Sequence, residues 1–216
     1  MMRNAAVILG VLCLIGVVQA DLVINGADPG AAWAGWMNVF ELDQTYLWGS
    51  AWGAADLRAT FDDNGVLTLA PNTNVWNPED AYWVKPDNTG NKIMEANFMQ
   101  EFGGGALAGQ TVTFNYIVGT NTLSDDYTAR AFIKVLDPDA GWATVQYEWL
   151  ELTPGAGSLS LSIDNIANAH TQVGFSLMGV PVDPAGPAAA TGVTIVPEPA
   201  SLALLALGTV LLRRRM

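Results

Sequence analysis

The sequence predicts an all-β protein, an antiparallel β-sandwich over residues 21–195, and three observations support this prediction. Half of the 216 residues are apolar, which suffices for one domain with a sizeable core. Between residues 21 and 196 the apolar residues recur mostly at every second position, the period of strands with one buried face. Clusters of Gly, Pro, Asn and Asp interrupt this pattern about every ten to fifteen residues, without a long helical stripe between them.

The individual strands follow from this alternation. Residues 158–163 alternate serine with an aliphatic residue, and Asn64-Gly65 between two apolar runs is typical of a hairpin turn. A short helix is expected over residues 54–58. In chain order, the expected strands are 22–25, 57–61, 66–70, 93–102, 111–118, 128–135, 144–152, 158–163, 173–177 and 191–196.

Residues 1–20 have the pattern of a secretory signal peptide. Arg3 precedes an apolar stretch over residues 5–18, and the small residue Ala20 ends the segment. About 14 apolar residues fall short of the roughly 20 that cross a bilayer as a helix, which disfavours an uncleaved anchor. Cleavage after Ala20 removes Cys13, the single cysteine, so the mature chain forms no disulfide.

The other end of the sequence carries a second short apolar segment. Pro197, Glu198 and Pro199 precede the uncharged residues 200–212, and Arg213, Arg214 and Arg215 follow them. This order resembles the PEP-CTERM sorting signal over residues 196–216. The resemblance implies transient membrane insertion through a short transmembrane helix, recognition by an exosortase-type transpeptidase, and delivery to the cell surface or an extracellular matrix. The positive-inside rule keeps the arginines cytoplasmic and places the body outside.

Parts of the body also resemble a known fold family. Residues 109–114, Gly-Gln-Thr-Val-Thr-Phe, and the run 128–135 resemble the central strands of galactose-binding-like jelly rolls. Residues 173–177 and 192–195 are similar to the last two strands of that family. The resemblance implies a jelly-roll-like sandwich and a carbohydrate-binding-like module that is often non-catalytic.

The charge balance excludes a class of partner. The chain has 21 acidic residues against 9 basic ones, a formal net charge of −12. Because nucleic-acid binding depends on neutralising phosphates with Lys and Arg, a nucleic-acid partner is excluded. In the body the bases are Arg58, Lys85, Lys92, Arg130 and Lys134.

Residue types limit the possible chemistry. His170, the single histidine, lies in an expected surface loop, and without a Gly-x-Ser-x-Gly motif no Ser-His-Asp site is predicted. With one histidine and one cysteine in the chain, a zinc site built from nitrogen and sulfur ligands is excluded, and no cofactor is expected. Calcium stays an alternative because the clusters 137–141, 62–65 and 125–126 offer oxygen ligands, although each also has the composition of an ordinary turn.

Tryptophan is the unusual component of the composition. Six of the eight lie between residues 33 and 83. Trp48, Trp52 and Trp76 stand among Gly, Ser, Asn and Pro, as exposed loop residues would, and flat aromatic faces suit sugar rings. These three are the candidate carbohydrate-binding residues, whereas Trp33, Trp36 and Trp149 are assigned to the core.

The sequence thus predicts an exported, non-enzymatic protein of the cell surface or matrix, structural or adhesive, with polysaccharide as a candidate ligand. Signal peptidase and the transpeptidase are its expected partners during export. The alternative is a secreted polysaccharide-active enzyme that uses two of the many carboxylates.

Overall fold

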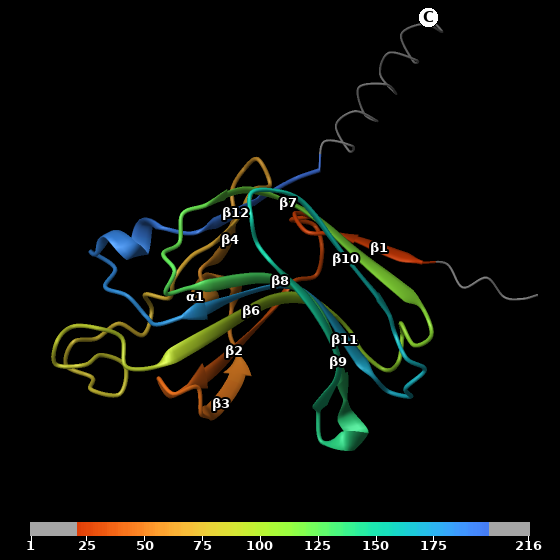
Figure 1. Cartoon of the computed structure of the whole chain (residues 1–216), viewed down its shortest axis with the longest axis horizontal. Coiled ribbons are helices and arrows are strands. Elements are labelled where there is room, and N and C mark those ends of the chain that lie inside the picture. Colours follow the sequence, from red (N-terminus) through yellow and green to blue (C-terminus); the bar gives the residue numbers. More distant parts are fainter. Residues whose placement is uncertain (1–20, 199–216) are drawn as a thin grey trace, which may run out of the picture.

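A computed structural model describes residues 21–198, and in this range two six-stranded sheets stack as a β-sandwich (Figure 1). Sheet A runs in the order β4 (Ala59–Phe61), β5 (Leu67–Leu69), β12 (Val193–Val196) and β7 (Thr111–Asn121). β1 (Leu22–Asn25) pairs with the first half of β7, and β10 (Gly155–Ser162) pairs with the opposite edge of β7. The sandwich class predicted from the sequence is therefore confirmed.

Sheet B forms the second layer. Its strands lie in the order β3 (Tyr46–Ala51), β2 (Ala34–Phe40), β6 (Ile93–Phe102), β11 (His170–Gly179), β8 (Thr128–Asp137) and β9 (Ala143–Glu151). Three short helices connect strands: α1 (Ala54–Leu57), η1 (Pro138–Ala140) and η2 (Pro187–Ala190). No helix within residues 21–198 is long and apolar enough to cross a membrane.

The core lies between the two sheets and follows the period-two pattern. Phe114 of sheet A and Phe175 of sheet B are fully buried, with ring centroids 5.1 Å apart. Trp33 enters the core from the segment before β2 and stacks on Phe98 at 4.7 Å. Its assignment to the core is confirmed.

The hairpin predicted at residues 62–65 is present. Gly65 has a φ of 76°, and the Asp62 carboxylate accepts hydrogen bonds of 2.9 Å from the backbone N–H groups of Asn64 and Val66. β4 and β5 pair antiparallel on either side of this turn. The short helix expected before it is also present as α1.

The structure corrects three predictions. β2 and β3 were not expected as strands; each contains one glycine and lacks a clear period-two alternation. β1 pairs with β7 in parallel, so sheet A is mixed rather than purely antiparallel. Trp36 and Trp149 are both 39% exposed and do not belong to the core. They occupy strand positions that alternate with core residues and so point to the opposite face of sheet B.

Candidate functional site

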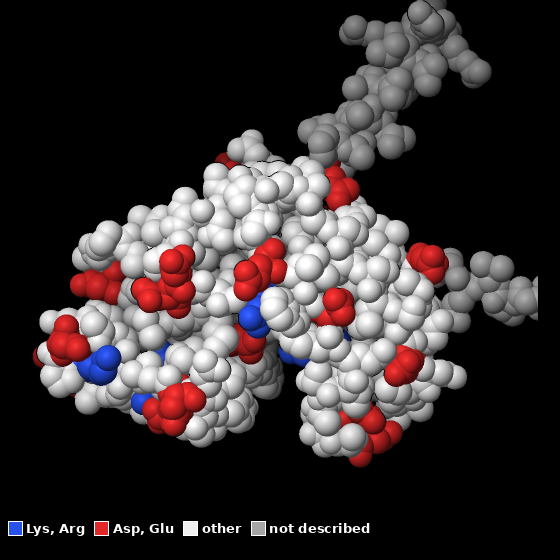
Figure 2. Space-filling model, viewed as in Figure 1, with Lys and Arg blue, Asp and Glu red and all other residues white. Residues whose placement is uncertain are grey.

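The face of sheet B that points away from sheet A forms a cleft. In Figure 2 it is the notch between the part of the molecule that carries β2 and β3 and the part that carries β9 (Figures 1 and 2). Its cavity volume is about 690 Å³. We call this the sheet B cleft and define it by its lining residues: Trp36, Asn38, Tyr46, Glu101, Lys134, Leu136, Gly141, Trp142, Thr144 and Gln172.

Aromatic side chains stand on both sides of the cleft. Trp36 and Tyr46 come from β2 and β3, and Tyr46 is 57% exposed. On the far side is Trp142, 54% exposed, and beyond the lining residues the β9 side chains Tyr147 and Trp149 lie on the same face of sheet B. β2 and β9 are four strand spacings apart, about 19 Å. This separation leaves room for a chain of several sugar rings across the strands.

Hydrogen bonds hold the first aromatic wall. The Trp36 indole N–H donates to Asn38 Oδ1 at 2.9 Å, and Asn38 Nδ2 donates to Glu95 Oε2 at 2.7 Å. The indole can occupy this position only because residue 49 is a glycine: a Cβ at Gly49 would lie 2.7 Å from Trp36 Nε1. The glycine therefore makes the room in which this ring is oriented.

A second polar group supports the opposite wall. His170 Nδ1 lies 2.6 Å from Glu101 Oε1, and Gln172 Nε2 donates to Glu101 Oε2 at 2.9 Å. The Trp142 ring meets the His170 imidazole edge to face, with centroids 4.8 Å apart. Trp142 has a φ of 65°, which places it at the turn that leads into β9.

Two basic residues of β8 belong to the same face. The Arg130 guanidinium lies 3.9 Å from the Trp149 ring centroid, and Lys134 Nζ lies 5.3 Å from that of Phe132. Burial lowers the pKa of Lys134, although Glu95 and Glu101 act in the opposite direction. Burial and the Glu95 charge raise the pKa of Tyr147, against the effect of Arg130. The middle of the cleft therefore holds charges of both signs.

The three tryptophans proposed for binding do not come together. Trp48 lies on β3 rather than in a loop and packs against the core, and its N–H donates to the Tyr82 hydroxyl at 2.8 Å. Trp52 also packs against the core and donates to Ser50 Oγ at 2.9 Å. The interpretation of Trp48 and Trp52 as exposed loop residues was therefore wrong. Trp48 pairs with the buried Val39 and lies on the same face of sheet B, and Trp52 packs against the core.

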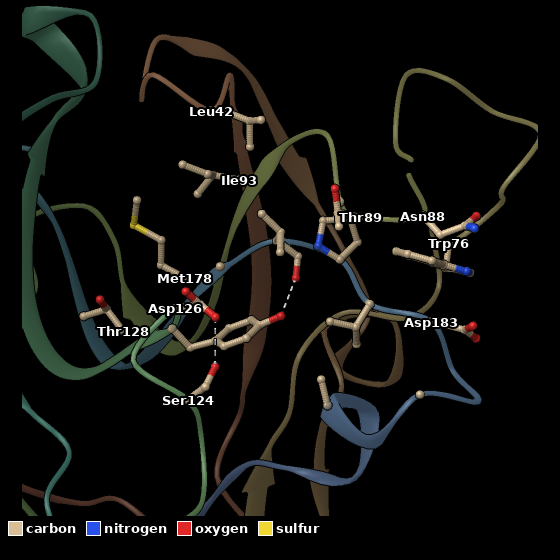
Figure 3. A pocket seen from close by; sticks show the side chains of 18 of the residues that line it. Leu42, Trp76, Asn88, Thr89, Ile93, Ser124, Asp126, Thr128, Met178 and Asp183 are labelled. Atoms are coloured by element: carbon tan, nitrogen blue, oxygen red, sulfur yellow. Dashed lines mark hydrogen bonds between the residues drawn. The ribbon is translucent and has the colours of Figure 1, made fainter. Parts of the chain in front are cut away.

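Trp76 lines a separate pocket of about 600 Å³ at one end of sheet B. Figure 3 shows Leu42, Ile93 and Met178 on one side of this end pocket and Trp76 on the other. Met178 pairs across the sheet with Glu95 and Thr128, so the end pocket opens on the same face as the cleft.

Other predicted sites have ordinary structural surroundings. Asp137 Oδ1 caps η1 by accepting from the N–H of Asp139 at 2.9 Å, and Asp62 closes its turn. Residues 21–198 contain no group of three or more His, Cys, Asp or Glu that could hold a metal ion. Pro197 and Glu198 directly follow β12, and Glu198 lines a shallow hollow beside β7 and β10.

The remaining sorting residues, Pro199 and Arg213, Arg214 and Arg215, lie outside the described residues, as does the expected signal peptide.

No family model matches the chain, and no curated protein matches it. Among solved structures it is similar to the enzymatically active domain of tailspike protein 4 of bacteriophage CBA120, with 14% identity and a TM-score of 0.32. That match covers 61% of this chain and 16% of the tailspike chain, and a likeness so low carries no argument about function.

Sequence reasoning missed the cleft, although one signal pointed to it. Glu95, Asn97 and Glu101 occupy odd positions of one expected strand, and Arg130 and Lys134 occupy even positions of another. Polar residues at a period of two mark the face turned away from the core. This alternation does not show which strands are neighbours in the sheet. The polar residues of 93–102 and the basic residues of 128–135 therefore could not be assigned to one site from the sequence.

Proposed function

We propose that the chain is an exported, non-enzymatic protein of the cell surface or extracellular matrix that binds polysaccharide in the sheet B cleft. The proposal includes a jelly-roll type of sandwich, a signal peptide over residues 1–20, and a sorting tail with a short transmembrane helix over residues 196–216. Signal peptidase and an exosortase-type transpeptidase would act on these two ends.

The observation that carries the binding proposal is the pair of exposed aromatic walls above a floor of oriented polar groups. Indole and phenol faces give sugar rings apolar contact, while amides and carboxylates hydrogen-bond their hydroxyls. Trp36 is held by its hydrogen bond to Asn38, and Trp142 packs against the His170 ring on the other side of the cleft. Both rings are therefore positioned in the absence of ligand. Preorganisation of this kind reduces the entropic cost of binding.

The enzymatic alternative receives less support from the same face. Glu95 and Glu101 lie six residues apart on β6, about 20 Å along the strand, whereas paired glycosidase carboxylates are about 5–9.5 Å apart. Both acids are also engaged by side-chain donors. These distances favour binding without turnover.

A binding and turnover assay tests the function. The secreted protein should retain glycans on an array, with affinities in the millimolar to high micromolar range if two or three rings stack at about 1 kcal/mol each. Trp142→Ala should weaken binding, whereas Val23→Ala, an exposed position on β1 of sheet A, should not. Release of reducing ends from a bound polysaccharide would refute the non-enzymatic assignment.

The sorting proposal has its own test. Intact mass of the protein from its native host should show a chain that begins at Asp21 and has lost the segment after the Pro-Glu-Pro motif. Recovery of the full-length chain alone, embedded in membrane, would contradict it.

A further inference from the structure

We propose that the sheet B cleft selects acidic polysaccharides, glycans whose carboxylate groups bind at Lys134 and Arg130. This inference rests on the proposed function and specifies the class of its ligand.

The first observation concerns the two basic residues of β8, Lys134 in the lining of the cleft and Arg130 beside the cleft on the same face of sheet B. Among the described residues, the ion pairs within 4 Å are Lys92 with Glu41 and His170 with Glu101. Neither Lys134 nor Arg130 therefore has a carboxylate partner at that distance. Arg130 Nε is buried and has no hydrogen-bond partner. A buried donor without an acceptor costs free energy, so the position of Arg130 is not explained by stability alone.

The second observation concerns the acids that could have paired with these cations. Glu95 accepts hydrogen bonds from Asn38 at 2.7 Å and from Asn97 at 3.3 Å. Glu101 is held by His170 and Gln172. Both acids are thus engaged by other donors, and the cations are the cleft groups left for a negatively charged ligand.

Stability alone does not explain Lys134. Its charge is disfavoured by burial beside Phe132, and an aliphatic side chain of similar length would pack there without that cost. By contrast, Arg58 elsewhere donates to the backbone carbonyls of Pro71 and Ala189, and Lys92 pairs with Glu41. The charged groups of those two bases have acceptors in the protein, whereas neither Lys134 nor Arg130 has a carboxylate within 4 Å, and Arg130 contacts the aromatic side chains of Trp149 and Tyr147 instead.

The ligand class follows from combining these charges with the walls. Arg130 presents a planar fork that suits a carboxylate, stacked on Trp149 at the wall where sugar rings would lie. A polymer that offers a carboxylate on successive rings can reach both basic residues, which stand four residues apart on β8, about 13 Å. Because the chain carries a net charge of −12, general attraction of polyanions does not substitute for these local contacts.

The test compares acidic glycans with neutral forms of the same sugars. Oligogalacturonate, alginate and hyaluronate fragments are titrated into the secreted protein beside their methyl-esterified or carboxyl-reduced counterparts. We expect at least one acidic form to bind about tenfold tighter than its neutral counterpart. Lys134→Met should remove most of that preference, because it should weaken binding of the acidic form far more than binding of the neutral form.

Lys85→Met is the matched control, because it deletes one positive charge in a loop that does not line the cleft. It should retain the preference for the acidic form. Arg130→Gln provides a second variant should Lys134→Met fail to fold. Equal or tighter binding of the neutral forms overturns this inference while the proposed function stands. Absence of binding to every acidic and neutral glycan overturns both.

Discussion

Trp33 and Trp36 lie three residues apart, yet we expect their replacement by alanine to have opposite consequences. Trp33 stacks on Phe98 with an interplanar angle of 8°, contacts Phe61 at 6.1 Å, and donates from its indole to the Asp28 carbonyl at 2.7 Å. Trp36 is 39% exposed and faces the cleft. The first substitution removes core packing, and the second removes a wall of the cleft.

The magnitudes follow from burial. Truncating a buried tryptophan costs about 3–5 kcal/mol, and the partial burial of Trp33 places Trp33→Ala near about 3 kcal/mol. For a domain of this size that lowers Tm by roughly 6–12 °C. Trp36→Ala should change stability by about 0.5 kcal/mol or less, which is below roughly 2 °C. Loss of one stacked ring should weaken glycan binding about fivefold.

Scanning calorimetry and titration of the same samples check both parts. Trp33→Ala, assayed below its Tm, should bind glycan with unchanged affinity. If Trp36→Ala lowers Tm as much as Trp33→Ala, the Trp36 ring stabilises the fold, and its assignment to the binding surface is wrong. If both variants bind glycan as the unmodified protein does, the cleft is not the binding site.

Three further predictions concern the scaffold. Gly174→Ala should prevent soluble expression or lower Tm by more than 10 °C, since a Cβ there would overlap the Phe98 carbonyl and lie 2.6 Å from Met99 Cα. Tyr127→Phe should cost about 1 kcal/mol in urea unfolding, because the hydroxyl, whose pKa burial raises to about 12, donates to Val180 O at 2.8 Å. Asp62→Asn should flatten the fall of Tm below about pH 4. The Val66 N–H lowers the pKa of Asp62, so its contribution is present above the unfolded pKa and lost as pH falls through the folded one.

The alternation of side chains made most of the sandwich predictable. Thr111–Asn121 and Gly155–Ser162 reveal their buried faces directly, because serine, threonine and asparagine alternate with aliphatic and aromatic residues. β3 escaped prediction for a physical reason. Gly49 lies in β3 because the side chains of Trp36 and Asn38 on the neighbouring strand leave no space for a Cβ. These contacts cannot be predicted from the composition of the β3 segment itself.

The site was harder to predict than the fold for a related reason. Tryptophan is suited equally to a core and to a sugar platform, so only its register on a strand decides between them. Trp48 follows the register of the buried Val39, and Trp36 that of the polar Asn97. Without β2 and β3 in the predicted topology, the indoles could not be assigned to the correct faces.

The position of β12 has a consequence for the order of folding. Four residues near the end of the body, Val193–Val196, join the β4–β5 hairpin to β7. Sheet A cannot close until this last strand has been synthesised, because the hairpin has no other strand partner among the described residues. Long-range pairing of this kind is slow. The body therefore remains incomplete until Val193–Val196 have been synthesised, a state that would suit the export proposed above.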